Sequence, residues 1–268
     1  MIIWALFDSG NGCYTQAVEK YFPCTKIYPI GVDVENKNNH FINLDLSDFT
    51  ELFDGKNKIF ETLDKLPIPD IILASPPCES WSLATSLTNG TNYWQTTQEI
   101  NSLFGSYKAP TAFTIQTKDN FDHALKKRKS FFKAFWHNTI YNRVNGELCA
   151  YNTLRIIERY KPTIWIIENP QTSKLWAYYK QIHNFTGIKN NAHYNYYDEE
   201  FPKKPTTFLS NIFLDLKITD EKAKVVLKNC GDGRKVIYGY NKRSNIPTSL
   251  IKDILQMCKQ ELKMKDER

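Results

Sequence analysis

The sequence predicts an α/β fold built on a mostly parallel sheet, with one inserted lobe. Short apolar segments alternate with stretches of helical pattern along the first half of the 268-residue chain. Most of these apolar segments run directly into polar or glycine-bearing turns. A strand followed by a helix, repeated, favours parallel strands joined by right-handed crossovers. The alternation is interrupted once, at residues 83–145, and this interruption predicts the lobe.

The N-terminal part contains four expected strands and one early helix. The first strand leads into Asp8-Ser9-Gly10-Asn11-Gly12, a turn, and the helix after it continues until Pro23. The fourth strand is stopped by Ser75-Pro76-Pro77-Cys78, because two consecutive prolines cannot continue a ladder of backbone hydrogen bonds. The four expected strands are Ile2–Phe7, Ile27–Val34, Phe41–Leu44 and Asp70–Ala74.

The second half adds two strands and two helices. Apolar residues recur at helical spacing from Glu147 to Tyr160, which favours a crossover helix before the fifth strand, Pro162–Ile167. A strand over Thr207–Phe213 and a last helix over Thr248–Lys263 follow. The sixty or so residues of the interruption are too long for a plain connection. We therefore expect one domain made of residues 1–82 and 146–268, and a lobe made of residues 83–145.

Composition gives few constraints on function. The net charge of +6 suits a partner that carries phosphates, although many proteins are slightly basic. The six cysteines show no C-x-x-C spacing, so we expect no metal site and no disulfide framework. No apolar run is long enough to span a membrane, and the N-terminal apolar segment has no basic leader. We expect a monomer in the cytoplasm.

Acidic residues and glycines stand at three expected strand ends. Gly10 and Gly12 allow a tight turn and a close backbone approach to a nucleotide-like ligand. Asp33, after the second strand, could accept hydrogen bonds from two ribose hydroxyls, and Asp45, after the third, would lie near an adenine amino group. Each residue alone is typical of a cap or a solvated loop. Together with Asp8 they indicate a nucleoside-binding edge.

A thiol and a carboxyl group follow two other strands. Cys78 comes directly after a Pro-Pro pair, which would present the thiol on a rigid turn. Glu168 ends the fifth strand at the same edge of the sheet. A nucleophile and an acid on neighbouring strands suit covalent attack on an electron-poor ring. The alternative for Cys78 is a buried structural cysteine. Glu168-Asn169-Pro170 could also begin a helix with Asn169 as its cap, which is compatible with the acidic role of Glu168.

In this order, the motifs D-x-G-x-G, strand-end Asp, Pro-Pro-Cys-x-x-Trp-Ser and Glu-Asn-Pro resemble the DNA cytosine-5 methyltransferase family, especially short phage-type members. The resemblance implies a Rossmann-like, S-adenosylmethionine-dependent fold, a DNA substrate and a bacterial or phage-infected host cell with a restriction–modification context. It implies that Cys78 is the nucleophile, that Glu168 engages the base, that Asn169 braces the Pro-Pro-Cys loop and that Ser82 lines it. The cofactor residues that it implies are Phe7, Asp8, Gly10, Gly12, Asp33, Asp45 and Pro76.

The chain departs from the family pattern at several positions. Asp8 stands where the family usually has an aromatic residue. The family's Gln-x-Arg-x-Arg has no counterpart near Asn195–Tyr197, and Lys203 or Lys204 could replace the base-contacting arginine, although a lysine offers a point charge and not a fork. The usual target-recognition region is reduced to about residues 212–240.

The lobe is therefore the candidate DNA-recognition region. Lysine and arginine alternate with aromatic residues there, a pattern that suits phosphate contact and base stacking. The alternative is an amphipathic helix with a solvated basic face. The basic cluster consists of Lys126, Lys127, Arg128 and Lys129.

Two other functions stay open on the sequence alone. An RNA cytosine-5 methyltransferase usually carries a second catalytic cysteine in the later motif, and Glu168-Asn169-Pro170 has none. A catalytically degenerate homologue could bind DNA or the cofactor without turnover. The missing arginine favours this second alternative, whereas the intact Cys78 and Glu168 disfavour it.

Overall fold

The computed structural model describes residues 1–32, 40–51, 55–82, 94–95, 99–102, 105–108, 114–127, 135–227, 233–237 and 244–267. The chain divides into two compact units. The first contains Met1–Pro76, Tyr151–Gln171 and Gly187–Arg268, and the second contains Pro77–Ala150 and Thr172–Thr186. The lobe expected at residues 83–145 thus falls within the second unit, which also takes in residues 77–82, 146–150 and 172–186. Among the described residues, no helix is long and apolar enough to cross a membrane.

The first unit is built on a mixed seven-stranded sheet with the strand order β10-β11-β9-β4-β1-β2-β3. Five neighbouring strands, from β9 to β3, run parallel, and β11 and β10 are added antiparallel at one side. The strands are β1 (Ile2–Leu6), β2 (Lys26–Gly31), β3 (Ile42–Asn43), β4 (Ile71–Ala74), β9 (Ile164–Pro170), β10 (Ile188–His193) and β11 (Pro205–Ser210).

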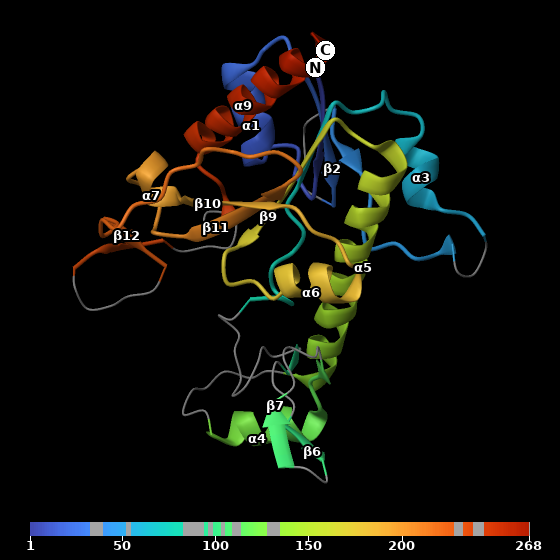
Figure 1. Ribbon diagram of the computed structural model, residues 1–268, viewed down its shortest axis with the longest axis vertical. Helices are drawn as coiled ribbons and strands as arrows, with labels where there is room; N and C mark the ends of the chain where they lie inside the picture. The colour runs from blue at the N-terminus through green and yellow to red at the C-terminus, as the bar shows by residue number, and fades with distance from the viewer. Residues whose placement is uncertain are drawn as a thin grey trace. The chain divides into compact units, whose positions relative to one another are not determined.

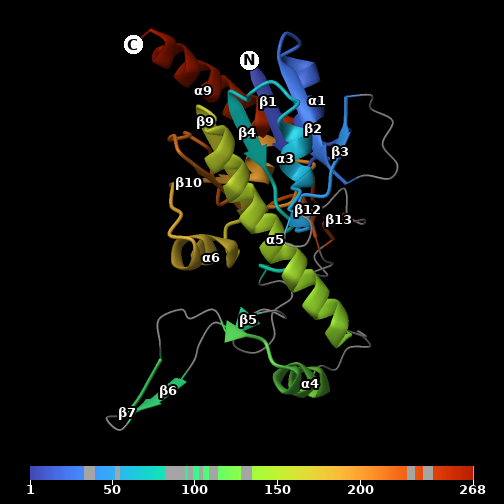
Figure 2. The same ribbon diagram turned by 90° about the vertical axis from the view of Figure 1, so that its right-hand side faces the viewer.

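Helices cover both faces of this sheet. Alternate side chains of β1 point to opposite faces, as the pleat of a strand requires. Ile3 and Ala5 join the core beneath α1 (Cys13–Tyr21) and α9 (Thr248–Asp266), which lie side by side in Figure 1. Trp4 points to the other face, where its ring meets Tyr160 with 4.6 Å between centroids. That face carries α3 (Lys58–Leu63) and the C-terminal part of α5 (Trp136–Tyr160), on the viewer's side in Figure 2.

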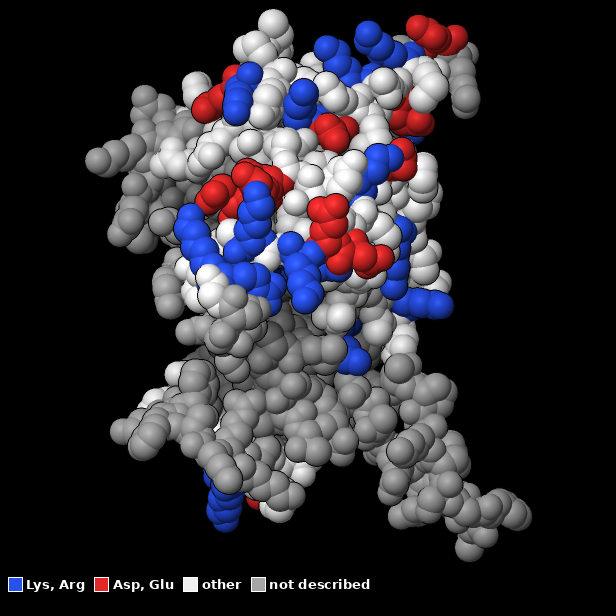
Figure 3. All heavy atoms as spheres, turned by 90° about the vertical axis from the view of Figure 1, so that its left-hand side faces the viewer, with Lys and Arg blue, Asp and Glu red and all other residues white. Residues whose placement is uncertain are grey.

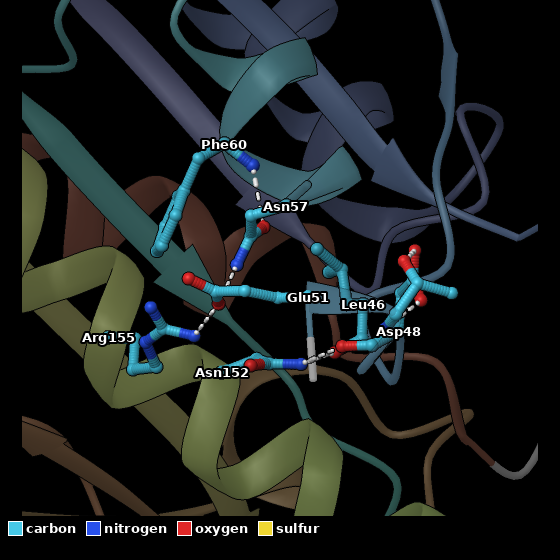
Figure 4. Close-up of polar contacts among 8 residues, drawn as sticks. Leu46, Asp48, Glu51, Asn57, Phe60, Asn152 and Arg155 are labelled. Carbon is cyan, nitrogen blue, oxygen red and sulfur yellow. Dashed lines mark hydrogen bonds and ion pairs between the residues drawn. The ribbon is translucent and has the colours of Figure 1, made fainter. Parts of the chain in front are cut away.

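Helix α5 also fastens the segment that follows β3. The Asn152 amide donates hydrogen bonds to the carbonyl oxygens of Leu46 (2.9 Å) and Asp48 (3.1 Å), and Arg155 pairs with Glu51 at 2.9 Å (Figure 4). Asn152 is buried, whereas the Arg155–Glu51 pair is partly exposed. The buried amide is therefore the stronger of the two ties, because a buried carbonyl without a donor is costly.

The strand β10 lies at the edge of the sheet, and a later segment covers part of its outer side. His193 donates its backbone N–H to the carbonyl of Lys217 at 3.1 Å. The Asn190 side chain is 3 % exposed and accepts a hydrogen bond from the backbone N–H of Leu214. Its amide donates to the carbonyl oxygens of Ile188, Phe208 and Ile212. The short elements α7 (Tyr194–Tyr197), β12 (Val225–Val226) and β13 (Lys235–Val236) complete the first unit.

The second unit contains the elements of the lobe and its surroundings. Its described part has two antiparallel strand pairs and the helices α4 (Lys118–Lys127) and α6 (Leu175–Ile182), besides the N-terminal part of α5. Trp81, Trp94 and Tyr178 pack their rings together within this unit. The strand pairs are β5 (Trp94–Gln95) with β8 (Thr114–Ile115) and β6 (Glu99–Ser102) with β7 (Gly105–Lys108).

Three expectations about the elements need correction. The segment Glu168-Asn169-Pro170 does not begin a helix, because β9 continues through Pro170 and pairs with β11, whose long ladder overrides the capping propensity of Asn169. Helix α5 begins at Trp136, eleven residues before Glu147. The strand expected over Thr207–Phe213 starts at Pro205 and ends at Ser210.

Candidate active site

The strand order of the first unit changes direction between β1 and β4. The chain moves from β1 outward to β2 and β3, and then returns to place β4 on the other side of β1. Ligands of open α/β sheets bind beyond the carboxyl ends of the strands at such a point. Here those ends lead into Phe7–Gly12 and Ser75–Pro76, and the backbone N–H of Ser75 donates to the Leu6 carbonyl at 3.3 Å.

The turn after β1 is tight. Phe7 and Gly10 both adopt left-handed backbone conformations, with φ of 64° and 71°. The Asp8 carboxylate, 6 % exposed, accepts hydrogen bonds from the Ser9 backbone (2.9 Å) and from the Thr15 hydroxyl (2.9 Å) and backbone (3.3 Å). A Cβ at position 12 would lie 1.6 Å from an Asp8 oxygen, so any other residue there would force the Asp8 carboxylate to move. Asp8 therefore joins the turn to the first part of α1.

Burial raises the pKa of Asp8 above its ordinary value, and the hydrogen bonds from Thr15 and Ser9 oppose that rise. A carboxylate that already accepts these hydrogen bonds is best described as the support of the turn. The contacts of Phe7, Asp8, Gly10 and Gly12 with a cofactor stay predictions.

The two other acidic residues expected to contact a cofactor are Asp45 and Asp33. Asp45 is exposed, and one carboxylate oxygen accepts hydrogen bonds from the backbone (2.8 Å) and the hydroxyl (2.7 Å) of Ser47. It lies just before Leu46, whose carbonyl Asn152 binds (Figure 4). Asp33 lies outside the described residues.

Glu168 is a buried carboxyl group within β9, 8 % exposed. The Tyr194 hydroxyl donates a hydrogen bond to it at 3.3 Å, and the Ser75 side chain lies near enough to lower its pKa. Ser75 in turn exchanges a hydrogen bond with the Tyr14 hydroxyl at 2.8 Å. The parallel pairing of Ala74 with Ile167 explains why Ser75 and Glu168 meet.

Burial raises the pKa of Glu168, and the positive charge of Lys204 together with the two hydroxyl groups opposes that rise. Lys204 is half-buried, and its ammonium group lies 5.1 Å from the centre of the Tyr194 ring. The raised pKa biases the Glu168 carboxyl towards its protonated form, as a proton donor requires.

The Cys13 thiol is also shifted. Burial, with the negative charges of Asp8 and Glu168 nearby, raises its pKa to about 12.

Sequence reasoning missed Tyr14, Ser75 and Tyr194, which surround Glu168. The only signal for Tyr14 is its place beside the glycine turn, at the first turn of the helix. Tyr194 follows β10, a strand that the sequence did not predict.

Asn169 and Pro76 are in direct contact. The Asn169 amide, 1 % exposed, donates to the Pro76 carbonyl at 2.9 Å, and its carbonyl oxygen has no partner among the described residues. Cys78 and Ser82 are half-buried and belong to the second unit. Asn169 thus holds the first proline of the Pro-Pro-Cys segment by a hydrogen bond.

The expected DNA contacts are only partly described. Lys126 is exposed on α4 and Lys127 ends that helix, whereas Arg128 and Lys129 lie outside the described residues. A second group of lysines lies around α7, β12 and β13, where Figure 3 shows basic and acidic side chains mixed. Three of those lysines pair with carboxylates, so this surface carries little net charge. The pairs are Lys203–Asp220, Lys224–Glu199 and Lys235–Glu200.

The part of the chain that the structure describes holds no cluster of three or more histidine, cysteine or acidic residues placed to bind a metal ion.

Comparisons with known proteins give little. No family model matches the chain, and no curated protein matches it. A solved structure with some likeness is that of an inferred DNA modification methyltransferase encoded within a prophage of E. coli. The likeness has a TM-score of 0.39 at 14 % sequence identity, and it covers 82 % of this chain but only 49 %, about half, of the other.

Proposed function

We propose that this chain is a DNA cytosine-5 methyltransferase with a Rossmann-like fold and an inserted DNA-reading lobe. In this proposal Cys78 attacks carbon 6 of a cytosine that has been flipped out of the duplex. The observation that carries it is Glu168, a buried carboxyl group with a raised pKa, on the strand next to the one that leads into Pro76-Pro77-Cys78.

The tie between Asn169 and Pro76 supports the pairing of Cys78 with Glu168. Asn169 follows Glu168 directly, and its amide holds the Pro76 carbonyl. Consecutive Cα atoms are about 3.8 Å apart, so the Cα atom of Cys78 lies within about 7.6 Å of that of Pro76. The proposal therefore assigns the thiol that follows Pro76 by two residues and the acid that precedes Asn169 to one reaction.

The proposed reaction passes through a covalent adduct between Cys78 and the cytosine. The Cys78 thiolate forms a bond to carbon 6 of the cytosine while the Glu168 carboxyl donates its proton to ring nitrogen 3. Carbon 5 thereby becomes nucleophilic and would take a methyl group from bound S-adenosylmethionine, whose sulfur–methyl bond would break to leave S-adenosylhomocysteine. The proton on carbon 5 then passes to water, the bond between Cys78 and carbon 6 breaks to regenerate the thiolate, and nitrogen 3 returns its proton to Glu168.

The turn after β1 fits a nucleoside-type cofactor. Its glycines and the left-handed Gly10 bring the backbone close to the carboxyl end of β1, at the point where the strand order changes direction. Asp45 keeps an exposed carboxylate, and Asp33 would follow the end of β2. The residues proposed to hold S-adenosylmethionine are Phe7, Asp8, Gly10, Gly12, Asp33, Asp45 and Pro76.

Lys204 is our candidate for the missing arginine. Of these two lysines, Lys203 pairs with Asp220 at 3.6 Å. Lys204 is half-buried, and its positive charge lowers the pKa of Glu168. It would thus be placed to contact the carbonyl oxygen of the same base. The DNA contacts proposed beyond the base are Ser82 and the cluster Lys126, Lys127, Arg128 and Lys129.

DNA that contains 5-fluorocytosine tests this function. Fluorine on carbon 5 cannot leave as a proton, so the covalent adduct between Cys78 and the base should accumulate when S-adenosylmethionine is present. We expect a denaturant-resistant complex on gels with the wild-type chain. Cys78→Ser should abolish it, because a serine hydroxyl is far less ionised at neutral pH. Glu168→Gln should slow it by about 100-fold, the typical contribution of a general acid.

Cys24→Ser is the matched control, because Cys24 is an exposed thiol away from these motifs. This variant should trap DNA like the wild type. Trapping by Cys78→Ser would show that another thiol is the nucleophile, and the absence of trapping or methylation by the wild type would overturn the function. Trapping on RNA in place of DNA would overturn the proposed substrate.

A further inference from the structure

The residues from Cys78 to Trp81 form a closed turn with two unlike halves. The Trp81 backbone N–H donates to the Cys78 carbonyl at 3.1 Å. Cys78 is half-buried and Glu79 is exposed, whereas Ser80 and Trp81 are only 2 % and 0 % exposed. The thiol therefore stands on the outer half of a turn whose inner half is buried within the second unit.

The inner half is anchored at several points. The Ser80 hydroxyl donates to the Asn142 carbonyl of α5 at 2.5 Å, and the Trp81 carbonyl accepts from the Lys174 backbone, just before α6, at 3.0 Å. The Trp81 ring stacks on Trp94, with centroids 5.6 Å apart and an interplanar angle of 11°, and also meets Tyr178 at 4.7 Å.

Gly146 lets the turn come this close to α5. Glycine destabilises the middle of a helix relative to alanine, so its presence there asks for a reason. A Cβ at position 146 would lie 2.2 Å from the Ser80 hydroxyl oxygen and 2.6 Å from the Ser80 Cβ. A side chain at position 146 would clash with Ser80, so Gly146 allows Ser80 to pack directly against the backbone of α5.

We propose that Gly146 and Ser80 are positioning residues, which lock the turn of Cys78 against α5 so that the thiol is presented from a rigid support. The consequence for catalysis rests on the proposed function, whereas the lock itself does not. A displaced turn would move the thiol relative to the base, and a misplacement of ~1 Å in an active site can cost about 100-fold in rate.

The lock can be tested without DNA by alkylation of the full-length chain with iodoacetamide. Peptide mass spectrometry would follow Cys78, with the exposed Cys24 as an internal reference. In Gly146→Ala the new methyl group should push Ser80 out and free the half-buried thiol, so Cys78 should react about tenfold faster, as expected from overpacking. Cys24 should be unchanged. The control Asn145→Ala, an exposed position on the same helix, should leave both rates unchanged.

A double-mutant cycle separates the lock from general loosening. Ser80→Gly removes both atoms that the new Cβ would meet, so Gly146→Ala should have no further effect on Cys78 in that background. An unchanged rate in Gly146→Ala, or an equal acceleration in both backgrounds, would overturn the proposal. If the wild type traps 5-fluorocytosine DNA, trapping should be about 10- to 100-fold slower in Gly146→Ala. A wild type that never traps refutes the proposed function alone.

Discussion

Glu168 is a buried carboxyl group whose burial bears on stability as well as on its proposed role in catalysis. Its carboxyl group is buried among Ser75, Tyr194 and the charge of Lys204, and burial outweighs these partners in setting its pKa. The folded protein therefore holds the proton more tightly than the unfolded chain. As the pH rises above about 4.5, the unfolded state gains ionisation first, and the folded state loses relative stability.

Glu168→Gln should remove this dependence. Below the ordinary pKa of a glutamate, Glu168 of the wild type is protonated in both the folded and the unfolded state, so the wild type and the variant should melt alike. At neutral pH the variant should melt at a higher temperature. The difference in Tm between the two proteins should grow as the pH rises, and circular dichroism between pH 4 and pH 8 measures it. Glu158→Gln, an exposed position, should show no such trend. A variant that melts lower than the wild type at pH 8 would contradict the account.

The surroundings of Glu168 could not have been predicted from the sequence. The motifs placed the glycine turn and the Pro-Pro pair just after strands, because local apolar runs and proline define such ends. They placed Glu168 after a strand that ends at Ile167, which is wrong, because β9 continues through Pro170 and Glu168 lies within it. Tyr194 binds this carboxyl group directly, and Tyr14, 180 residues earlier in the chain, binds the neighbouring Ser75. Only the tertiary structure brings these segments together. The special backbone of Phe7 was likewise invisible, since a non-glycine residue at φ 64° follows no composition rule.

At the level of elements, the parallel strands were the predictable part of the fold. Their buried apolar runs stand out, and β1, β4 and β9 match the expected positions closely. The strand β10 was missed because its sequence, Ile188-Lys189-Asn190-Asn191-Ala192-His193, is mostly polar, and its buried Asn190 is satisfied by side-chain hydrogen bonds that no pattern reveals. Helix α5 was expected too short, since its first turns bury less apolar surface.

The two contacts of α5 with the segment after β3 should differ in strength. Asn152→Ala leaves two carbonyl groups without their donor and should cost about 1–3 kcal/mol. Arg155→Met keeps the stem but removes a partly exposed ion pair, and should cost less than about 1 kcal/mol. Urea denaturation measures both.

The same variants probe the cofactor edge. Because Asn152 holds the segment that carries Asp45, Asn152→Ala should also weaken S-adenosylmethionine binding in calorimetry, whereas Arg155→Met should not. Equal losses of stability in the two variants would show that burial does not distinguish these ties.

At the scale of the whole molecule, the net charge of +6 is spread unevenly. Three lysines around α7, β12 and β13 pair with carboxylates, namely Lys203, Lys224 and Lys235, and they supply little net attraction for phosphates. Figure 3 shows basic and acidic side chains mixed on this face. The cluster Lys126–Lys129 has four basic residues in succession and no acidic neighbour within it. If it contacts DNA, it should dominate the salt dependence of binding.

Replacing the four residues of this cluster with glutamine should weaken DNA binding and flatten the plot of log affinity against log salt concentration. The slope should fall by up to about 3.6 units, since each phosphate contact contributes about 0.9. The matched control replaces Lys252, Lys259, Lys263 and Lys265 of α9. Both variants lower the net charge from +6 to +2, because each loses four positive charges. Equal slopes in the two variants would assign the effect to net charge and not to the lobe.

The edge of the sheet has a consequence for how the protein behaves in concentrated solution. An exposed edge strand is a template on which a second chain can add its own strand. On β10, the segment around Leu214 and Lys217 occupies part of that edge, and the exposed Lys189 places a charge on the strand itself. A local opening in residues 212–219 would remove this protection and would also withdraw Ile212 and Leu214 from the core. Exposure of the β10 edge and loosening of the core would therefore occur together, and both favour aggregation.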